Sequence, residues 1–196
     1  RIEVENTLIA LRDLAAAYRV DIAEPVVAVT GSTGKTTTKD MLAAVLPGAW
    51  AAPRSYNNEV GVPLTILGTP HAARYVVIEV GSRGTGHIEW LLPAIRPDVA
   101  VITNLGLVHL ETFGSFEEVR HAFLDFANNV PSDGAVVVCA DDPYLRELLP
   151  QITRRVMTYG LETKNADLTA EEVQLEPFGV RCRVLPHPSR AGAEAS

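Results

Sequence analysis

The stretch that decides the fold reads Thr30-Gly31-Ser32-Thr33-Gly34-Lys35-Thr36-Thr37-Thr38, directly after the apolar run Val26-Val27-Ala28-Val29. A run that is apolar at every position is typical of a strand buried on both faces of a parallel sheet. Helical spacing follows, and it predicts a helix that ends at Pro47-Gly48 and has one apolar face, made of Met41, Leu42, Val45 and Leu46. A strand, a glycine-rich turn and a helix in this order predict a phosphate-binding loop, or P-loop.

The residue types in this loop favour a nucleoside triphosphate. Gly31 and Gly34 permit a tight turn that points consecutive backbone N–H groups inward. The N-terminus of the helix adds partial positive charge, and the Lys35 ammonium adds a full charge for the β- and γ-phosphates. The Thr36 hydroxyl is suited to Mg²⁺. We therefore expect these residues to bind the nucleotide: Gly31, Ser32, Thr33, Gly34, Lys35, Thr36 and Thr37.

The spacing of the glycines narrows the class of nucleotide-binding protein. A standard P-loop has four residues between its glycines, which here would require a glycine in place of Val29. Gly31 instead precedes Gly34 by only three positions. This shorter loop disfavours small GTPases and most kinases, and the Asn-Lys-x-Asp motif that reads guanine is absent from the sequence.

Strands and helices alternate along the rest of the chain. Apolar runs predict strands at 75–80, 99–102, 135–138 and 155–159, and helical spacing predicts helices at 5–19, around 88–92 and after a capping box at 115–118. Behind that capping box runs an apolar stripe made of Val119, Phe123, Phe126, Ala127 and Val130. Alternation of this kind predicts an α/β fold with a doubly wound, mostly parallel sheet. Short strand-like runs after Asp167 predict a small β-rich extension at the C-terminal end.

We divide the chain into three parts: a lead-in helix and linker at 1–21, a central domain at 22–185 that is incomplete at its C-terminal end, and a flexible tail at 186–196. The hydrophobic residues, 47% of the chain, are sufficient for a packed core, and the net charge of -7 argues against general binding of nucleic acid. The sequence shows neither a membrane helix nor a signal peptide. We therefore expect a cytoplasmic protein in which Cys139 and Cys182 are buried, reduced thiols.

Several motifs, in a fixed order, resemble those of one enzyme family. The loop at 30–38 resembles the ATP loop of the Mur ligases and of their relative, folylpolyglutamate synthase. Further matching segments are 57–65 (NNEVGVPLT), 77–81 (VIEVG) with 86–88 (GHI), 96–98 (RPD), 103–104 (TN) and 109–115 (HLETFGS). The resemblance covers roughly residues 5–160 and identifies the chain as the central ATP-binding domain of a member of this family.

The resemblance implies a ligase that forms an amide bond during synthesis of peptidoglycan precursors. In the family, the γ-phosphoryl group of ATP is transferred to a substrate carboxylate, and an amine then attacks the acyl phosphate. The implied cofactors are ATP and Mg²⁺. The implied partners in the full-length enzyme are a UDP-muramoyl substrate and an amino acid or dipeptide, with no nucleic acid and no membrane.

The resemblance also implies roles for single residues. Lys35 would hold the β- and γ-phosphates, and Thr36 with Glu79 would ligate one Mg²⁺. Glu79 ends a predicted buried strand, where open α/β sheets place their ligands. His109 would ligate a second Mg²⁺, so that Lys35, Glu79 and His109 form the catalytic set. We expect the loop residues Asn57, Asn58 and Asn104 to make polar contacts near the phosphates, whereas Asp141-Asp142-Pro143 caps the next helix and has no catalytic role.

Two departures from the family pattern leave alternatives open. The position of a carbamylated lysine found in many relatives falls on Phe123, and the late Gly-x-His-Asn segment is absent together with the flanking domains. This part of the enzyme alone is therefore not expected to be a competent ligase. The motifs up to about 114 resemble the branch that adds D-alanyl-D-alanine, whereas 116–131 and 141–143 resemble the branch that adds L-alanine to UDP-N-acetylmuramate. A non-catalytic or designed nucleotide-binding module of the same fold is the third possibility.

Overall fold

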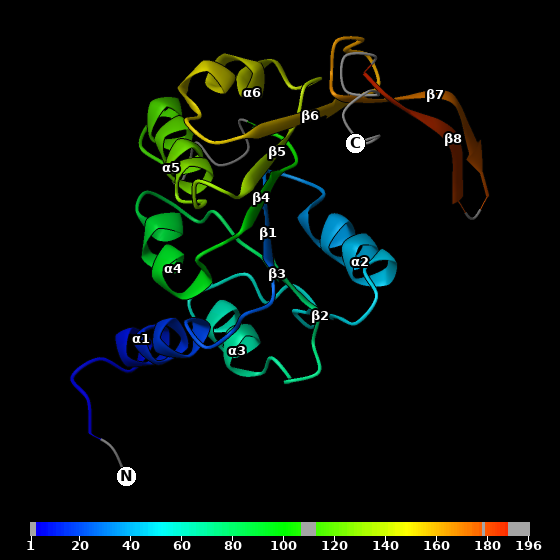
Figure 1. Cartoon of the computed structure of the whole chain (residues 1–196). Coiled ribbons are helices and arrows are strands. Elements are labelled where there is room, and N and C mark those ends of the chain that lie inside the picture. Colours follow the sequence, from blue (N-terminus) through cyan, green and yellow to red (C-terminus); the bar gives the residue numbers. More distant parts are fainter. Residues whose placement is uncertain (1–2, 107–112, 178, 188–196) are drawn as a thin grey trace.

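The structure is a computed structural model, and it describes residues 3–106, 113–177 and 179–187 (Figure 1). The strands are β1 (Val26–Thr30), β2 (Ala49–Ala51), β3 (Tyr75–Glu79), β4 (Val99–Ile102), β5 (Ala135–Cys139), β6 (Val156–Gly160), β7 (Leu168–Glu176) and β8 (Gly179–Pro186). The helices are α1 (Thr7–Arg19), α2 (Lys35–Val45), α3 (Gly61–Leu67), α4 (His87–Ile95), α5 (Phe116–Asn128) and α6 (Pro143–Leu148), followed by a 3-10 turn (Leu149–Gln151).

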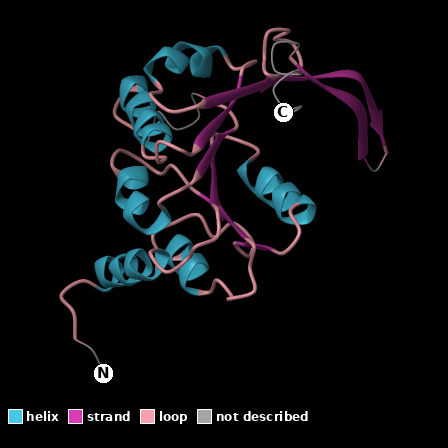
Figure 2. Ribbon diagram, viewed as in Figure 1, coloured by secondary structure: helices cyan, strands magenta, loops and turns pink. Residues whose placement is uncertain are grey.

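Within the described residues, one 8-stranded sheet has the strand order β2-β3-β1-β4-β5-β6-β7-β8. Neighbouring strands run parallel from β2 to β7, and only the hairpin of β7 and β8 is antiparallel. Helix α2 lies on one side of the sheet, and the other helices lie on the opposite side (Figures 1 and 2). The predicted α/β class, the doubly wound, mostly parallel sheet and the β-rich extension are confirmed.

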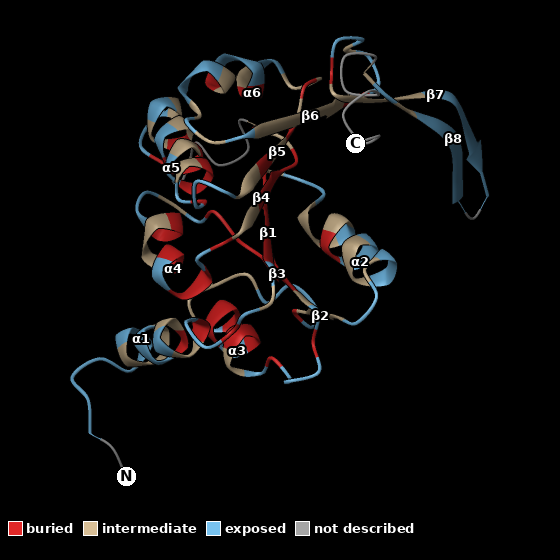
Figure 3. Ribbon diagram, in the orientation of Figure 1, coloured by how far each residue is buried: buried red, intermediate tan, exposed pale blue. Residues whose placement is uncertain are grey.

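Strand β1 is buried on both faces, as its all-apolar sequence predicts. All five of its residues are buried (Figure 3). Val26 and Ala28 belong to the large core cluster, whereas Val27 and Val29 belong to a smaller cluster on the other face. Because both faces of β1 are buried, apolar area is removed from water on each side of the strand, which stabilises it. The strand therefore fixes the position of the residues that follow it.

The position of β1 also determines where a ligand can bind. β1 lies between β3 and β4, and its register places Val29 beside Glu79 and Thr30 beside Ile102. From β1 the chain continues to β2 and β3 on one side and then crosses to β4 on the other. Parallel sheets bind their ligands at the carboxyl ends of the strands where the order reverses in this way. The loop after Thr30 lies at that point.

The predicted apolar face of α2 is wrong in part. Met41 is 65% exposed and Val45 is 70% exposed, whereas Lys39 is buried. Leu42 and Leu46 do pack against the small core cluster. Positions 39, 42 and 46 are three and four residues apart, so they share one stripe of the helix, and Met41 and Val45 lie on the neighbouring stripe. Apolarity alone placed Met41 and Val45 on the buried face because the position that is buried beside Leu42 and Leu46 carries a lysine.

The other predicted helices are confirmed with adjusted boundaries. α1 begins at Thr7, with the Asn6 side chain accepting hydrogen bonds from two backbone N–H groups of the first turn. The Ser115 side chain caps α5 by accepting from Glu118 N at 3.3 Å, and the apolar stripe of α5 is buried. The Glu118 carboxylate accepts a hydrogen bond from Thr85 Oγ1, so the second half of the predicted capping box has a different partner. Strand β2 and helix α3 were not predicted from the sequence.

The C-terminal hairpin differs from the core in burial. Most of β8 is exposed (Figure 3), and Cys182 on this strand is exposed rather than buried as predicted. The reason is that β7 and β8 extend beyond the helices that cover the rest of the sheet (Figure 1).

The predicted division at 21 and 185 stays a prediction, and residues 188–196 of the predicted tail lie outside the described residues. Every helix in the described part of the chain is too short or too polar to cross a lipid bilayer.

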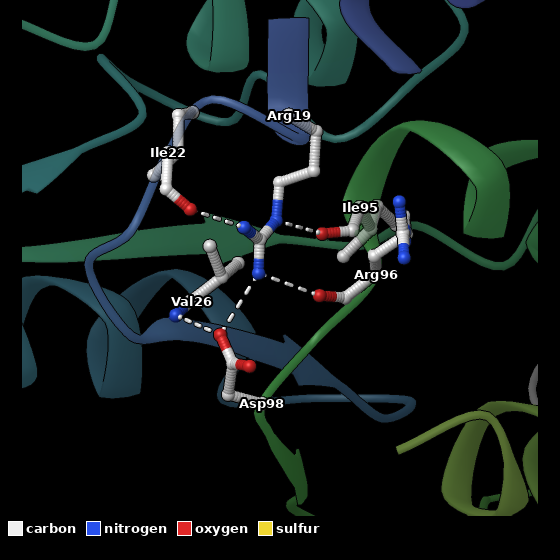
Figure 4. Close-up of polar contacts among 6 residues, drawn as sticks. All are labelled: Arg19, Ile22, Val26, Ile95, Arg96 and Asp98. Atoms are coloured by element: carbon white, nitrogen blue, oxygen red, sulfur yellow. Dashed lines mark hydrogen bonds and ion pairs between the residues drawn. The ribbon is translucent and has the colours of Figure 1, made fainter. Parts of the chain in front are cut away.

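One buried arginine ties α1 to the N-terminal ends of β1 and β4 (Figure 4). Arg19 is 7% exposed, and its guanidinium donates to Ile95 O at 3.0 Å, Ile22 O at 2.9 Å and Arg96 O at 2.9 Å. It also pairs with Asp98 Oδ2 at 2.8 Å, and this oxygen accepts from Val26 N at 2.8 Å. Burial lowers the pKa of Arg19, and the charge of Asp98 opposes that shift. The arrangement satisfies backbone carbonyls that helix ends leave without partners.

We expect Arg19→Met to lower the free energy of unfolding by about 2–4 kcal/mol, because buried carbonyls lose a charged donor and Asp98 loses its counterion. Urea denaturation followed by circular dichroism measures the change. Arg183→Met on the exposed hairpin is the matched control, since Arg183 is 57% exposed at its side chain and its ion pairs within the described residues are with exposed glutamates. The control is expected to change stability by less than about 0.5 kcal/mol. Equal losses in the two variants would contradict the structural role assigned to Arg19.

Candidate nucleotide and metal site

The loop between β1 and α2 has the backbone of a phosphate cradle. Gly31 has φ +138° and Gly34, the N-cap of α2, has φ +81°, both in the region that favours glycine. A Cβ atom on Gly31 would lie 2.0 Å from Thr103 Oγ1, whereas a Cβ on Gly34 would meet nothing within 4 Å. No side chain of the described residues caps α2, so the N–H groups of its first turn are available to an anion.

The residues after β4 hold this loop in place. Thr103 Oγ1 donates to Thr33 O at 2.6 Å. The Asn104 side chain donates to Thr33 O at 3.1 Å and accepts from Thr33 N at 3.0 Å, and Asn104 O accepts from Ser32 N at 3.1 Å. The Ser32 hydroxyl accepts from Gly106 N at 2.7 Å. Asn104 therefore supports the loop in this structure, and its predicted contact with a nucleotide stays a prediction.

Lys35, which was predicted to bind phosphate together with the loop, contacts the backbone of that loop. Its Nζ donates to Gly31 O at 2.6 Å and to Ser32 O at 3.2 Å. Burial lowers the pKa of Lys35, and the negative charge of Glu79 acts in the opposite direction. The ammonium is thus held by weak neutral acceptors within a partly desolvated loop. An incoming anion would be a stronger acceptor for it.

Glu79 and Thr36, which were predicted to act together, are in direct contact. Thr36 Oγ1 donates to Glu79 Oε2 at 2.8 Å, and Asn57 Nδ2 donates to Glu79 Oε1 at 2.7 Å. Glu79 is only 1% exposed, and none of the ion pairs between described residues involves it. A buried carboxylate whose hydrogen-bond donors among the described residues are neutral is costly, and a bound cation would offset that cost. Ser55 Oγ lies 3.3 Å from Thr36 Oγ1 and adds a further oxygen.

The oxygen atoms of Glu79, Thr36 and Ser55 are suited to a metal ion that keeps water and phosphate among its ligands. Within the described ranges there is no group of three or more His, Cys, Asp or Glu side chains that could hold a metal. Mg²⁺ is usually bound through one or two carboxylates together with the phosphates of a nucleotide, so it does not need such a group. One carboxylate and one hydroxyl beside a phosphate loop are therefore suited to Mg²⁺.

The two adjacent asparagines have different partners. Asn58 Oδ1 accepts from Gly61 N at 2.8 Å and from Val60 N at 3.2 Å, so it caps the start of α3. Asn57 is the residue that reaches Glu79. The predicted phosphate contact of Asn58 stays a prediction, and the sequence could not tell which asparagine faces the carboxylate. His109, the third predicted catalytic residue, lies outside the described residues.

Two acidic residues after β5 bind backbone N–H groups of neighbouring loops. Asp142 Oδ1 accepts from Leu145 N at 2.9 Å, which confirms the predicted cap of α6, and its Oδ2 accepts from Leu105 N at 2.9 Å. Asp141 accepts from backbone N–H groups after β6, among them Leu161 N at 2.6 Å. Burial alone would raise the pKa of Asp141, but these donors hold it below its usual range. Both carboxylates anchor loops, and Asp142 anchors the one that follows Asn104.

Comparison with known proteins agrees with this geometry. Residues 29–194 match the Mur ligase middle domain, and the chain belongs to that family. It is 40% identical over 165 residues to the UDP-N-acetylmuramoyl-tripeptide–D-alanyl-D-alanine ligase of Bacillus subtilis, an alignment that covers 83% of this chain and 35% of that enzyme. The predicted family and the resemblance to the branch that adds D-alanyl-D-alanine are confirmed.

Two further relatives are informative. The crystal structure of the MurF ligase from Thermotoga maritima in complex with ADP has a TM-score of 0.84 and 30% identity, and the match covers 96% of this chain and 44% of that one. The UDP-N-acetylmuramate–L-alanine ligase of Chlorobium phaeobacteroides is 35% identical over 149 residues, or 76% of this chain and 31% of that enzyme. The chain spans less than half the length of each of these three relatives.

The two loop glycines allow a direct comparison. We expect Gly31→Ala to lower the free energy of unfolding by about 2–4 kcal/mol, because the added methyl group collides with the Thr103 hydroxyl. Gly34→Ala has open space around it and carries only the left-handed backbone cost, about 1–2 kcal/mol. Urea denaturation of both variants tests the difference. A Thr103→Ala change should recover part of the loss in Gly31→Ala and none in Gly34→Ala; equal behaviour of the two glycines would refute the close approach.

Proposed function

We propose that this chain is the part of a ligase that binds ATP and Mg²⁺, and that the whole enzyme joins D-alanyl-D-alanine to a UDP-muramoyl tripeptide during peptidoglycan precursor synthesis in the cytoplasm. The observation that carries this proposal is the contact between Thr36 on the phosphate loop and the buried Glu79 at the end of the adjacent strand. The identity with the Bacillus subtilis enzyme supports the choice of substrates.

In the proposed complex, the loop amides and Lys35 bind the phosphates. The backbone N–H groups at the start of α2 meet the phosphate oxygens, and Lys35 Nζ exchanges Gly31 O and Ser32 O for the β- and γ-phosphates. Thr103 and Asn104 keep the loop in the shape that this requires. The residues proposed to contact the nucleotide are those predicted from the sequence: Gly31, Ser32, Thr33, Gly34, Lys35, Thr36, Thr37, Asn58 and Asn104.

The metal would be held by the Thr36 hydroxyl and the Glu79 carboxylate. Bound there, Mg²⁺ would neutralise charge on the phosphates. Asn57 orients the carboxylate through its hydrogen bond to Oε1. We also propose His109 as a ligand of a second Mg²⁺. Phe123, at the position of the lysine that many relatives use there, is fully buried in the core and offers no ligand.

The proposed reaction has two steps. An oxygen of the substrate carboxylate attacks the γ-phosphorus of ATP, the bond to the β-phosphate oxygen breaks, and ADP leaves. The amine of D-alanyl-D-alanine then attacks the acyl phosphate carbon and expels inorganic phosphate as the amide forms. This chain contributes by positioning the phosphates and by offsetting their charge, which are the main sources of rate in such transfers.

The branch that adds L-alanine to UDP-N-acetylmuramate is the second candidate. The observation in its favour is the apolar stripe of α5, where Phe123 is buried and where the sequence resembles that branch. Phosphate release by the full-length protein, assayed with each pair of substrates in turn, decides between the two. Release with neither pair, despite tight binding of ATP, would indicate a nucleotide-binding module without ligase activity.

Two variants test the site in the 196-residue chain by isothermal titration calorimetry. We expect Lys35→Ala to weaken binding of Mg-ATP by about 100-fold, because a charge-assisted contact to the phosphates is lost. We expect Glu79→Gln to remove the gain in ATP affinity that Mg²⁺ gives, while affinity measured in EDTA changes less than about twofold. Lys164→Ala, at an exposed lysine, is the control and should bind normally. Unchanged Mg-ATP affinity in Lys35→Ala would refute the site.

A further inference from the structure

A second lysine on α2 is buried one helical turn after Lys35. Lys39 is 2% exposed and is among the largest fully buried side chains. Its Nζ donates to Ala52 O at 2.8 Å and to Arg54 O at 2.6 Å, and it pairs with Asp40 Oδ1 at 3.0 Å. These three acceptors match the three N–H bonds of an ammonium.

A lysine is unusual on the face of a helix that packs against a sheet. A helix packed on a sheet usually buries apolar residues, and burying an ammonium is costly unless all its donors are satisfied. Asp40 is 66% exposed at its side chain, so its contribution is largely screened by solvent. The two backbone carbonyls are therefore the main partners of Lys39, and both belong to the segment that leaves the sheet after β2.

That segment, residues 52–57, connects α2 to the metal site. Ala52 N donates to Val77 O at 3.2 Å, which is its last contact with the sheet before the chain turns away. Arg54 has φ +53°, a left-handed conformation that costs a residue with a Cβ about 1–2 kcal/mol. The hydrogen bond from Lys39 to Arg54 O holds the chain in this conformation.

The residues that follow Arg54 reach the proposed metal ligands. Ser55 Oγ lies 3.3 Å from Thr36 Oγ1, and Asn57 Nδ2 donates to Glu79 Oε1 at 2.7 Å. Asn57 O accepts from Gly81 N at 2.8 Å, which fixes the far end of the segment. Lys39 thus holds the near end of 52–57, Asn57 is itself fixed at the far end, and Ser55 lies between these two points.

We propose that Lys39 is a positioning residue of the metal site: through the carbonyls of Ala52 and Arg54 it holds Ser55 and Asn57 against Thr36 and Glu79, and so sets the affinity for Mg²⁺ without contacting the nucleotide. The inference rests on the proposed function, because it assumes that Thr36 and Glu79 bind a metal. Groups that orient metal ligands typically change metal affinity by about 10–100-fold when they are lost.

The test compares Lys39→Met and Lys39→Arg with Lys164→Met, in the 196-residue chain. Methionine is close in length to lysine but donates no hydrogen bond, whereas arginine keeps hydrogen-bond donors. The sequence contains three lysines, Lys35, Lys39 and Lys164, and Lys164 is exposed, so it serves as the control. We expect Lys39→Met to weaken Mg²⁺ binding to the ATP-saturated chain by about 10-fold. ATP affinity in EDTA should change less than about twofold, and Lys39→Arg should recover part of the loss. Equal weakening with and without Mg²⁺ would show a purely structural role and overturn the inference.

A double-mutant cycle tests the route through the segment. Asn57→Ala removes the group that Lys39 is proposed to position, so adding Lys39→Met to it should cost little further Mg²⁺ affinity. Additive losses would overturn the inference. Trypsin cleavage after Arg54, followed by mass spectrometry, gives a readout that needs no ligand, and it should be faster in Lys39→Met than in the control.

Two outcomes keep this inference separate from the proposed function. If the unmodified chain binds ATP neither with Mg²⁺ nor without it, the proposed function is refuted. If ATP binding by Lys39→Met depends on Mg²⁺ as it does in the unmodified chain, only the role of Lys39 is refuted. If Lys39→Met does not fold, Lys39→Gln takes its place under the same criterion. Its shorter side chain keeps one donor group, and it must still lose Mg²⁺ affinity selectively.

Discussion

The hydrogen bond between the Thr36 hydroxyl and the buried Glu79 carboxylate joins the two halves of the site. Thr36 belongs to the first turn of α2, and Glu79 ends the strand beside β1. Their contact depends on the parallel register that sets Val29 opposite Glu79, because a shift of one residue would turn the carboxylate to the other face of the sheet. The buried strands thus determine where the carboxylate lies, and the loop determines where the phosphates would lie.

The features that could be predicted from the sequence are those that local pattern determines. The apolar run of β1 predicts burial on both faces, and the glycines predict the loop that follows. The capping residues Ser115 and Asp142 were predicted from their place before helical stretches, and both cap as expected. The metal role of Glu79 was predicted from the resemblance to the Mur ligases, and the position of Glu79 at the end of a predicted buried strand agrees with that role.

The features that could not be predicted depend on contacts between distant parts of the chain. Arg19 and Asp98 are 79 positions apart, and neither residue type alone indicates a clamp. Asn57 and Asn58 are the same residue type at adjacent positions, so only the path of the backbone separates the one that meets Glu79 from the one that caps α3. Lys39 was overlooked because a charged residue on a helix is normally solvated, and its partners are carbonyl groups, which any sequence supplies.

The polar contacts at the two ends of β1 and β4 have a common consequence. At one end, Asp98 accepts from Val26 N, and at the other end Thr103 Oγ1 lies 3.2 Å from Thr30 O. Each contact joins a residue that flanks β4 to a terminal residue of β1, so the alignment of this strand pair is specified twice, once before the pairing begins and once after it ends. Sliding of β1 along β4 would break both contacts together. Apolar side chains alone would specify the alignment less strictly, because a shifted strand would still place one apolar side chain where another had been. The polar contacts at the two ends of the strand pair favour a single alignment.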